Sequence, residues 1–345
     1  MKTKTRWLLT LAGLLLAGGA TLQQLQQMAL QSGPATETRK VVIPGGSSLR
    51  SVLGILQQQQ LVAHPRLLEY YLRLQDKLQQ QPALPLQAGH YRMEPGLSPL
   101  QQLQQLRDGR VILEQFTIVE GWNLRQLRAA LDASPLVTHE TAGLDAPALQ
   151  QALAAPVANL EGWFAPDTYR FEEQSSDLTI LRMAYESQQR RLQRAWAERD
   201  AGLPLATPAE VLTLASIVEK ETGLPAERPR IAAVFINRLR LGMRLQTDPT
   251  VIYGLGDGYD GNIRTRDLRT DTPYNTYTRE GLPPTPIAMP GAAALQATVH
   301  PQAGNDLYFV ALADGSGGHQ FSSSLAEHNA AVSRYLQRLR TTAAP

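Results

Sequence analysis

The feature that most constrains this chain is an apolar helix that ends in two glutamates. Residues 214–222 read L-A-S-I-V-E-K-E-T, and Thr207 followed by Pro208 marks a helix start just upstream. The apolar positions follow the i, i+3, i+4, i+7 spacing of one helix face. Continuing that spacing brings Glu221 to the interior face near the helix end, whereas Glu219 lies at the border of the apolar arc.

A carboxyl group in such a place has a defined chemistry. Burial without a partner is costly for the charged form, so desolvation raises the pKa of the carboxyl. A carboxylic acid that stays neutral at working pH can protonate a leaving oxygen. The alternative is that Glu219 and Glu221 only cap the helix or pair with Lys220 and Arg228 on a solvated surface. Periodicity alone leaves both interpretations open.

Composition excludes several function classes. The chain has 345 residues, which favours two folded modules, and 43% of them are hydrophobic, enough for real cores. A formal charge of +2 gives no case for nucleic acid as a partner. The absence of cysteine excludes disulfides, thiolate metal sites and a lipidated Cys. His300 and His319 are isolated from metal-ligand spacings, so we expect neither a metal nor another cofactor.

The N-terminus looks like an export signal. Residues 1–6 carry three basic side chains and predict a cytoplasmic tail, because positive flanks stay inside. An uncharged apolar run follows over residues 7–22, and a Gln-rich tail extends it to residue 30. We interpret residues 7–30 as a transmembrane anchor and stalk. A cleaved signal peptide is the alternative, and both place the rest of the chain outside the cytoplasm.

The remainder predicts an α+β protein. Residues 38–131 form a small α+β module in which the order strand, Gly turn, amphipathic helix occurs over residues 40–56 and again over 115–131. This order resembles the LysM-type sugar-binding unit, although a plain spacer domain fits nearly as well. Residues 132–206 are expected to connect this module to a mostly helical α+β catalytic domain at 207–340.

The connecting region contains one unusual segment. Residues 160–171 read L-E-G-W-F-A-P-D-T-Y-R-F, and they predict a loop that gathers four aromatic rings with Glu161 and Asp167. Such a mixture suits sugar faces and hydroxyls, and it suits a structural brace equally well.

Polar groups downstream of the glutamates suit sugar hydroxyls and acetamides. They lie in the motifs Q-T-D-P-T and Y-N-T-Y, and the candidates are Gln246, Asp248, Tyr274, Asn275 and Tyr277. Bracing of their own loops is the alternative role.

Three further candidates lie outside those motifs. Asn237 and Arg238 lie on a helix expected at 229–241 and could meet Glu221 across a helix pair, or form a structural knot of hydrogen bonds and ion pairs. Ser322, together with His319, could close one end of the cleft.

Taken together, these motifs resemble the membrane-anchored endolytic murein (peptidoglycan) transglycosylases. The resemblance rests on A-S-I-V-E-K-E-T, V-F-I-N-R-L, G-M-R-L-Q-T-D-P-T-V-I-Y-G, Y-N-T-Y, G-L-P-P, G-G-H-Q-F-S and E-G-W-F-A-P-D-T-Y-R-F, and it covers almost the whole chain. It implies a lyase that cuts the β-1,4 bond between N-acetylmuramic acid and N-acetylglucosamine and leaves a 1,6-anhydro end. The I-V-E-K-E-T run is similar to the I-x-x-x-E-S run of other lytic transglycosylases. That register implies Glu221 as the catalytic acid, with Glu219 as the fallback.

The resemblance also implies a setting and leaves two alternatives. It implies a single-pass protein of the inner membrane, with the N-terminus cytoplasmic and the catalytic domain periplasmic. Its partners would be peptidoglycan strands and, at family level, a glycan polymerase of the division or elongation machinery. If Asp248 served as a second carboxylate, the enzyme would be a hydrolytic muramidase. A non-catalytic peptidoglycan-binding scaffold is the rival from another class.

Overall fold

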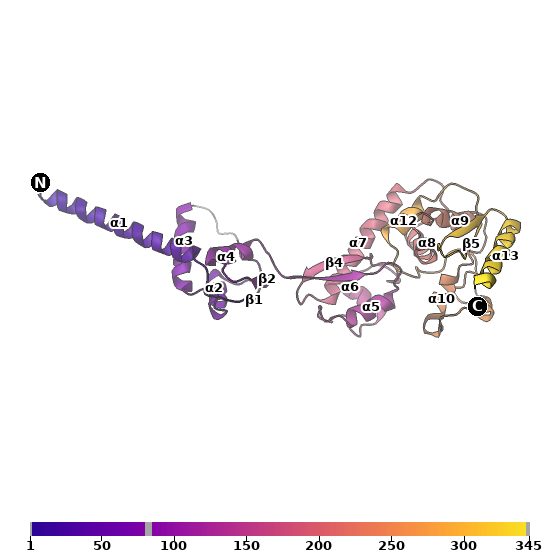
Figure 1. Cartoon of the computed structure of the whole chain (residues 1–345), viewed down its shortest axis with the longest axis horizontal. Helices are drawn as coiled ribbons and strands as arrows, with labels where there is room; N and C mark the ends of the chain where they lie inside the picture. The colour runs from indigo at the N-terminus through magenta and orange to yellow at the C-terminus, as the bar shows by residue number, and fades with distance from the viewer. Residues whose placement is uncertain (1, 80–84, 343–345) are drawn as a thin grey trace. The chain divides into compact units, whose positions relative to one another are not determined.

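The computed structural model describes residues 2–79 and 85–342 and has a mixed α+β fold (Figure 1). The chain divides into two compact units. Unit 1 comprises Met1–Glu114 with Arg170–Gln174, and unit 2 comprises Gln115–Tyr169 with Ser175–Pro345. This division differs from the expected one. The predicted 38–131 module would end inside a helix of unit 2, and the residues expected to connect two domains belong mainly to unit 2.

Unit 1 is built on a two-stranded antiparallel sheet in which Arg39 lies opposite Met93. Ser48 and Ser98 each cap the N-terminus of a helix that follows a strand and a Gly turn, which is why the chain enters a helix at both points. Its elements are β1 (Arg39–Ile43), α2 (Leu49–Gln58), α3 (Pro65–Gln79), β2 (Gly89–Met93) and α4 (Pro99–Arg107). Tyr71 and Tyr91 are the largest side chains of its buried core.

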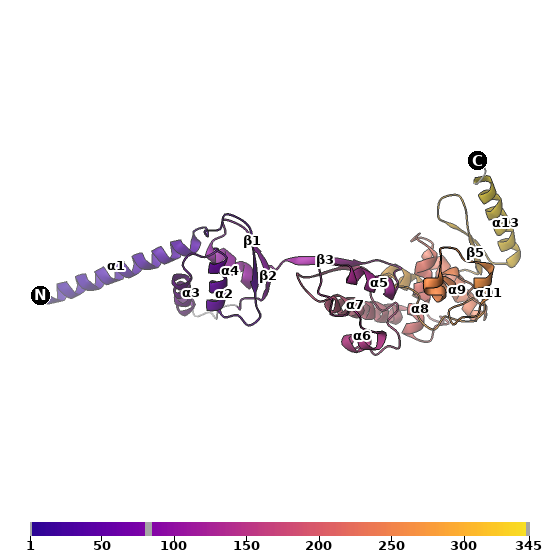
Figure 2. The ribbon, with the colours of Figure 1, turned by 90° about the horizontal axis from the view of Figure 1, so that it is seen from below.

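The N-terminal helix α1 (Lys2–Leu30) ends against this core (Figure 2). Leu25 and Ala29 are buried there, next to α3 and α4. The Gln-rich end of α1 is therefore a packed part of unit 1, and its interpretation as a stalk is wrong. Within the residues that the structure describes, no helix combines the length and the apolarity needed to cross a membrane. The transmembrane anchor expected at residues 7–30 is thus not confirmed.

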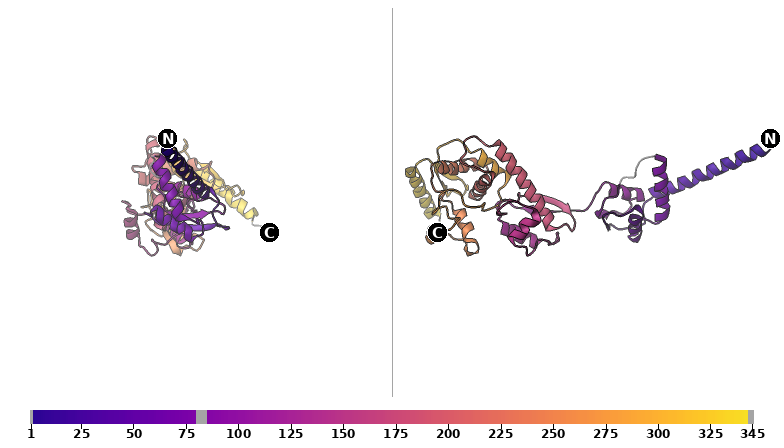
Figure 3. Two further views of the ribbon diagram at one scale, coloured as in Figure 1. Left: turned by 90° about the vertical axis from the view of Figure 1, so that its left-hand side faces the viewer. Right: turned by 180° about the vertical axis from the view of Figure 1, so that it is seen from behind.

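Unit 2 has a helical core. α8 (Pro208–Glu221) is buried at every position from Val211 to Val218, as expected for a helix surrounded by others. It contacts α7, α9 and α12, and these helices lie together in both Figure 1 and Figure 3. The helices of this unit are α5 (Leu124–Asp132), α6 (Ala146–Leu153), α7 (Asp177–Glu198), α8, α9 (Arg228–Arg240), α10 (Asp248–Leu255), the 3₁₀ turn η1 (Gly256–Gly258), α11 (Thr265–Arg269), α12 (Ala292–Val299) and α13 (Leu325–Thr342).

Two further two-stranded sheets complete the fold. β3 (Leu113–Ile118) pairs with β4 (Asp167–Glu172), so the second half of the segment 160–171 is a strand and not the loop that was expected. β5 (Tyr308–Ala311) and β6 (His319–Ser322) form an antiparallel hairpin, and α13 packs against both strands. This hairpin brings residues far from α8 in the sequence to the site described next.

Candidate active site

Glu221 is the last residue of α8, and it lies in a pocket of about 500 Å³ within unit 2. The residues that form this Glu221 pocket are Glu221, Arg238, Leu245, Gln246, Thr247, Asp248, Tyr277, Tyr308, Phe309, Val310, Ala311, His319, Leu325, His328 and Asn329. Five segments therefore meet here: the end of α8, α9 with the loop that leads into α10, the turn that carries Tyr277, the β5–β6 hairpin and the start of α13. The carboxyl is open to the pocket and closed off elsewhere by protein.

The environment of Glu221 favours its protonated form. Burial raises the pKa of Glu221 to about 7; the Thr247 hydroxyl, which donates to Glu221 Oε1, acts against burial and lowers the pKa. The negative charge of Asp248 raises the pKa further, and the Arg238 guanidinium lowers it. Part of the residue's surface remains exposed, but protein atoms crowd the carboxyl itself, and that crowding produces the shift. The result is an acid that can hold or release a proton near neutral pH.

Thr247 is held in place by other threonines. It is 2% exposed, and its N–H donates to Thr276 Oγ1 at 3.1 Å. Thr276 Oγ1 lies 2.9 Å from Thr250 Oγ1, and the Thr250 hydroxyl donates to the Thr247 carbonyl at 2.7 Å. Sequence reasoning missed Thr247, although it stands between the two chosen residues of Q-T-D-P-T. Its burial could not be read from that motif.

Gln246, Asp248 and Tyr277 lie in the Glu221 pocket, as their candidate roles require. The Tyr277 hydroxyl donates to Asp248 Oδ1 at 2.5 Å, so the second carboxylate of the pocket is engaged. Gln246 has a φ of 51°, in the left-handed region that non-glycine residues rarely occupy. Such strain persists only where the surroundings impose it, and it is common at functional sites.

Arg238 also lines the pocket, but its guanidinium donates mainly to backbone carbonyls. Its guanidinium donates to the carbonyls of Leu307 at 2.6 Å and Leu245 at 2.8 Å, tying the β5 approach to the loop after α9. Burial lowers its pKa. The neighbouring Asn237 donates to the carbonyls of Gly304 and Asp306 and does not line the pocket. These contacts are those of a structural brace, the alternative role given above for both residues. A substrate-binding role for Arg238, which lines the pocket, stays a prediction.

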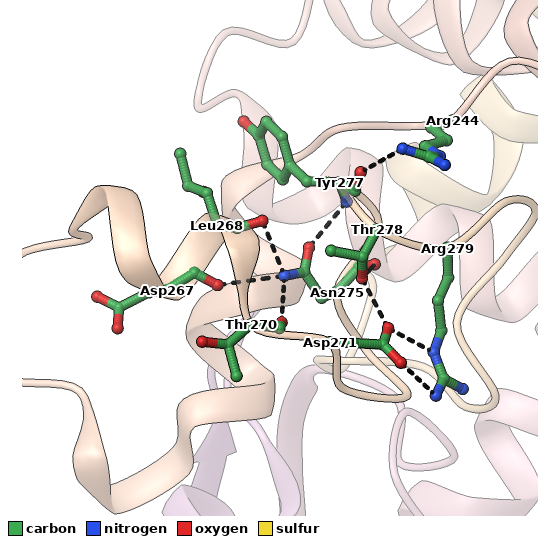
Figure 4. A network of polar contacts seen from close by, with 9 residues as sticks. All are labelled: Arg244, Asp267, Leu268, Thr270, Asp271, Asn275, Tyr277, Thr278 and Arg279. Carbon is green, nitrogen blue, oxygen red and sulfur yellow. Dashed lines mark hydrogen bonds and ion pairs between the residues drawn. The ribbon is translucent and has the colours of Figure 1, made fainter.

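Asn275 is 1% exposed and lies outside the pocket, at the centre of the network in Figure 4. Its Nδ2 donates to the carbonyls of Asp267, Leu268 and Thr270, at 3.1, 3.1 and 2.7 Å. Its Oδ1 accepts the N–H of Tyr277 at 2.8 Å. Asn275 therefore positions the turn that presents Tyr277 to the pocket.

Two other candidates are not brought to the Glu221 pocket. Tyr274 faces a different hollow, and its hydroxyl lies 2.8 Å from Thr285 Oγ1. Tyr274 and Tyr277 therefore do not line one pocket, because the turn at Asn275 places the two rings in different hollows. Ser322 is 5% exposed within β6 and does not line the pocket either.

Glu219, the fallback acid, is occupied by structural contacts. Its Oε2 accepts the Gly291 N–H at 2.9 Å, and its Oε1 accepts from Arg228 at 3.4 Å. The side chain is 5% exposed and does not line the Glu221 pocket. Burial raises its pKa, while the Gly291 N–H lowers it. A carboxyl with this access cannot reach a polysaccharide in the pocket, so the geometry favours Glu221 over Glu219.

His319 completes one wall of the pocket. Its Nδ1 lies 2.7 Å from Glu227 Oε2, and its backbone N–H donates to Glu227 Oε1 at 2.9 Å. The ring orientation is thus set, with Nε2 left for other contacts. On the opposite strand Tyr308 stacks on His328, with ring centroids 5.1 Å apart. His328 also lines the pocket.

One group of side chains among the described residues has a spacing that could hold a metal ion: Asp132, His139 and Asp177. Both carboxylate oxygens of the buried Asp177 already accept backbone N–H groups, from Glu140 and Thr141. None of these residues lines the Glu221 pocket.

The comparisons with known proteins show the family of this chain. A family model described as the YceG-like family matches residues 41–334. The chain belongs to the YceG-like family. A protein of Bacillus subtilis (strain 168) named endolytic murein transglycosylase is 31% identical over 339 residues, covering 93% of this chain and 91% of the relative.

A second named relative and a solved structure are also similar to this chain. A protein of the same name from Streptococcus pneumoniae serotype 2 is 28% identical over 79% of this chain, and the match spans 54% of that longer relative. The crystal structure of a putative YceG-like protein from Listeria monocytogenes matches with a TM-score of 0.50 and 27% identity, covering 86% of this chain and 99% of that one.

Proposed function

We propose that this member of the YceG-like family is an endolytic murein transglycosylase, a lyase of peptidoglycan metabolism. It would cut the β-1,4 bond between N-acetylmuramic acid and N-acetylglucosamine within a glycan strand and leave a 1,6-anhydro end. The observation that carries the proposal is a single accessible carboxyl of raised pKa, Glu221, in a polar pocket of unit 2. The relatives named for this activity support it.

In the proposed mechanism, Glu221 supplies both proton transfers. As the neutral acid, it donates a proton to the glycosidic oxygen while an oxocarbenium-like centre forms at C1 of the muramic acid. The substrate's acetamido oxygen stabilises that centre. The Glu221 carboxylate then takes the proton of the C6 hydroxyl, which attacks C1 and closes the anhydro ring. One group with a pKa of about 7 suits both steps, because it can give and regain a proton near neutral pH.

The hydrolytic alternative depends on Asp248, the other carboxylate among the pocket-lining residues. Hydrolysis needs a second carboxylate to activate water or attack the sugar. The Tyr277 hydroxyl already donates to Asp248, which suits a residue that orders the pocket and binds sugar hydroxyls. We therefore favour the non-hydrolytic reaction, with Gln246, Asp248 and Tyr277 as the residues that bind the substrate.

Mass spectrometry of digested sacculi tests this proposal. We expect anhydro ends from the wild-type chain, and we expect Asp248→Asn to yield the same type of end at a lower rate. Reducing ends from the wild type would instead identify a muramidase, and unchanged sacculi would identify a binding scaffold. Either result would overturn the proposal.

The setting follows from the same proposal. Because its substrate lies outside the cytoplasm, we propose that the basic N-terminus stays cytoplasmic, that the N-terminal segment directs export or attaches the chain to the inner membrane, and that the catalytic domain works in the periplasm. Cell fractionation of the full chain, with and without residues 2–22, measures this. The βααβ order of unit 1 supports a LysM-like role in holding glycan strands. A glycan polymerase of the division or elongation machinery is the partner we propose to look for by cross-linking.

A further inference from the structure

A second hollow of unit 2, of about 830 Å³, adjoins the elements that build the Glu221 pocket. Three segments contribute to both: Lys220 precedes Glu221, Pro249 follows Asp248, and Tyr274 precedes the turn to Tyr277. We call it the aromatic hollow, and define it by the residues Asn123, Gln126, Glu161, Tyr253, Tyr259 and Tyr274. The mechanism above uses none of these side chains.

Three tyrosine rings give the aromatic hollow its character. Tyr253 and Tyr274 are in edge-to-face contact, with centroids 4.8 Å apart and planes at 61°. Tyr259 follows η1 and is half-buried. Tyrosine rings present an apolar face beside a hydroxyl, and such amphipathic surfaces suit the faces and rims of sugar rings.

Two amides lie next to the rings at the start of α5. Asn123 and Gln126 form a capping box in which each side-chain oxygen accepts a backbone N–H, at 2.9 and 3.0 Å. The capping box therefore uses the side-chain oxygens of Asn123 and Gln126 and not their NH₂ groups. In the part of the chain that the structure describes, neither amide NH₂ group has a hydrogen-bond partner, so both are left as donors for acceptors such as acetamido carbonyls.

Glu161 is a lining residue of the hollow and is 4% exposed. It accepts the Leu124 N–H on both oxygens, at 3.0 and 3.1 Å, and the Tyr253 hydroxyl at 3.1 Å. Burial raises the pKa of Glu161 to about 7, so the group carries little charge under mildly acidic conditions. The ion pair between Arg125 and Asp257 uses two further charges of the wall. Lys220 is the remaining charged residue of the wall, and its Nζ donates to the Gly121 carbonyl at 3.3 Å. A surface made mainly of rings and amides favours a neutral, amide-bearing sugar over an acidic peptide.

We propose that the aromatic hollow is a second glycan subsite, which binds N-acetylated sugar units of the strand beyond those held in the Glu221 pocket. The inference rests on the proposed function and extends it. An enzyme that cuts within a strand has sugar units on both sides of the cleaved bond, and the shared segments place the aromatic hollow next to the Glu221 pocket. Binding energy from remote units can be used to hold the reacting bond in place.

Kinetics on two substrates test the subsite. The full chain is given peptide-free glycan strands, and separately the same strands with their stem peptides. We expect Tyr259→Ala and Gln126→Ala each to raise KM about tenfold on both substrates, with kcat changed less than about twofold, equivalent to about 1.4 kcal/mol of lost binding. Tyr259→Phe, which keeps the ring, should stay near wild type. Gln193→Ala is the matched control, because Gln193 is an exposed helical glutamine on α7 outside both hollows.

The possible outcomes separate the two proposals. An unchanged KM for Tyr259→Ala and Gln126→Ala, in chains whose thermal unfolding matches that of wild type, would overturn the subsite. A loss confined to peptide-bearing strands would also overturn it and would identify a peptide site. If the wild-type chain made no anhydro ends, the proposed function would fail. The subsite would still be measurable, as binding of peptide-free strands to Glu221→Gln with and without Tyr259→Ala.

Discussion

The Glu221 pocket and the aromatic hollow each contain a carboxyl whose pKa burial raises to about 7, yet the two groups differ in what surrounds them. Glu161 accepts the Leu124 N–H and the Tyr253 hydroxyl and is 4% exposed, so its position is fixed by the fold. Glu221 accepts from one side chain, Thr247, and keeps an open face towards the pocket. A raised pKa therefore does not by itself identify an acid catalyst. Access to substrate and freedom from structural hydrogen bonds make the difference.

The largest expected effect tests that difference directly. Glu221→Gln removes the proton donor with little change of shape, and we expect the rate of anhydro-end formation to fall about 10³-fold, in the range for loss of a general acid. Glu219→Gln, two residues away, is the matched control and should keep the rate within about tenfold. A dead Glu219→Gln with an active Glu221→Gln would place the acid two residues earlier in the helix.

The second prediction concerns stability and pH. Because burial raises the pKa of Glu161 from 4.5 to about 7, the folded chain holds this proton more tightly than the unfolded chain. That stabilisation is present below about pH 4.5 and is lost as the pH rises through 7. When the pH is raised from about 5 to about 8, the free energy of unfolding should therefore fall more for wild type than for Glu161→Gln. We expect the difference between the two chains to reach up to about 3 kcal/mol. Urea unfolding at the two pH values measures it. Equal losses in both chains would show that Glu161 titrates normally.

The same substitution sharpens the contrast in activity. Since Glu161 is proposed to shape a subsite and not to transfer protons, Glu161→Gln should retain far more activity than Glu221→Gln. The expected loss is about tenfold, carried mainly by KM. A fall in kcat as deep as that of Glu221→Gln would mean that Glu161 takes part in the chemistry.

The smallest expected effect concerns Thr247. Its hydroxyl donates to Glu221 and lowers the pKa of that carboxyl, so Thr247→Val should raise the pKa. The neutral acid would then persist to higher pH, and the alkaline limb of the pH–rate profile should move upwards by up to about one unit. The rate at its optimum should change only a few-fold. A shift of the alkaline limb to lower pH would contradict a hydrogen bond in which Thr247 donates to Glu221.

Much of the fold could be predicted from local pattern. The helix expected at 229–241 differs from α9 by one residue at each end. Gly turns, Ser caps and regular apolar spacing are local signals, so they can be read without the tertiary structure. The short helices α10 to α12 were missed because their sequences carry motif residues or small apolar side chains and give no clear period.

The sequence by itself determined the helix that carries Glu219 and Glu221, because apolar periodicity and a Thr-Pro start specify where that helix lies. Its burial on every side from Val211 to Val218 depends on the helices that surround it. It also determined the family resemblance that assigns the catalytic role to Glu221, which stays a prediction. Only the tertiary structure decided which carboxyl is free. The Gly291 N–H and Arg228 occupy Glu219, while α10 and the β5–β6 hairpin leave Glu221 open to a pocket. Gly291 lies 72 residues from Glu219, and the β5–β6 hairpin follows Glu221 still further along the chain. No local pattern encodes such contacts, because they depend on how separate elements pack.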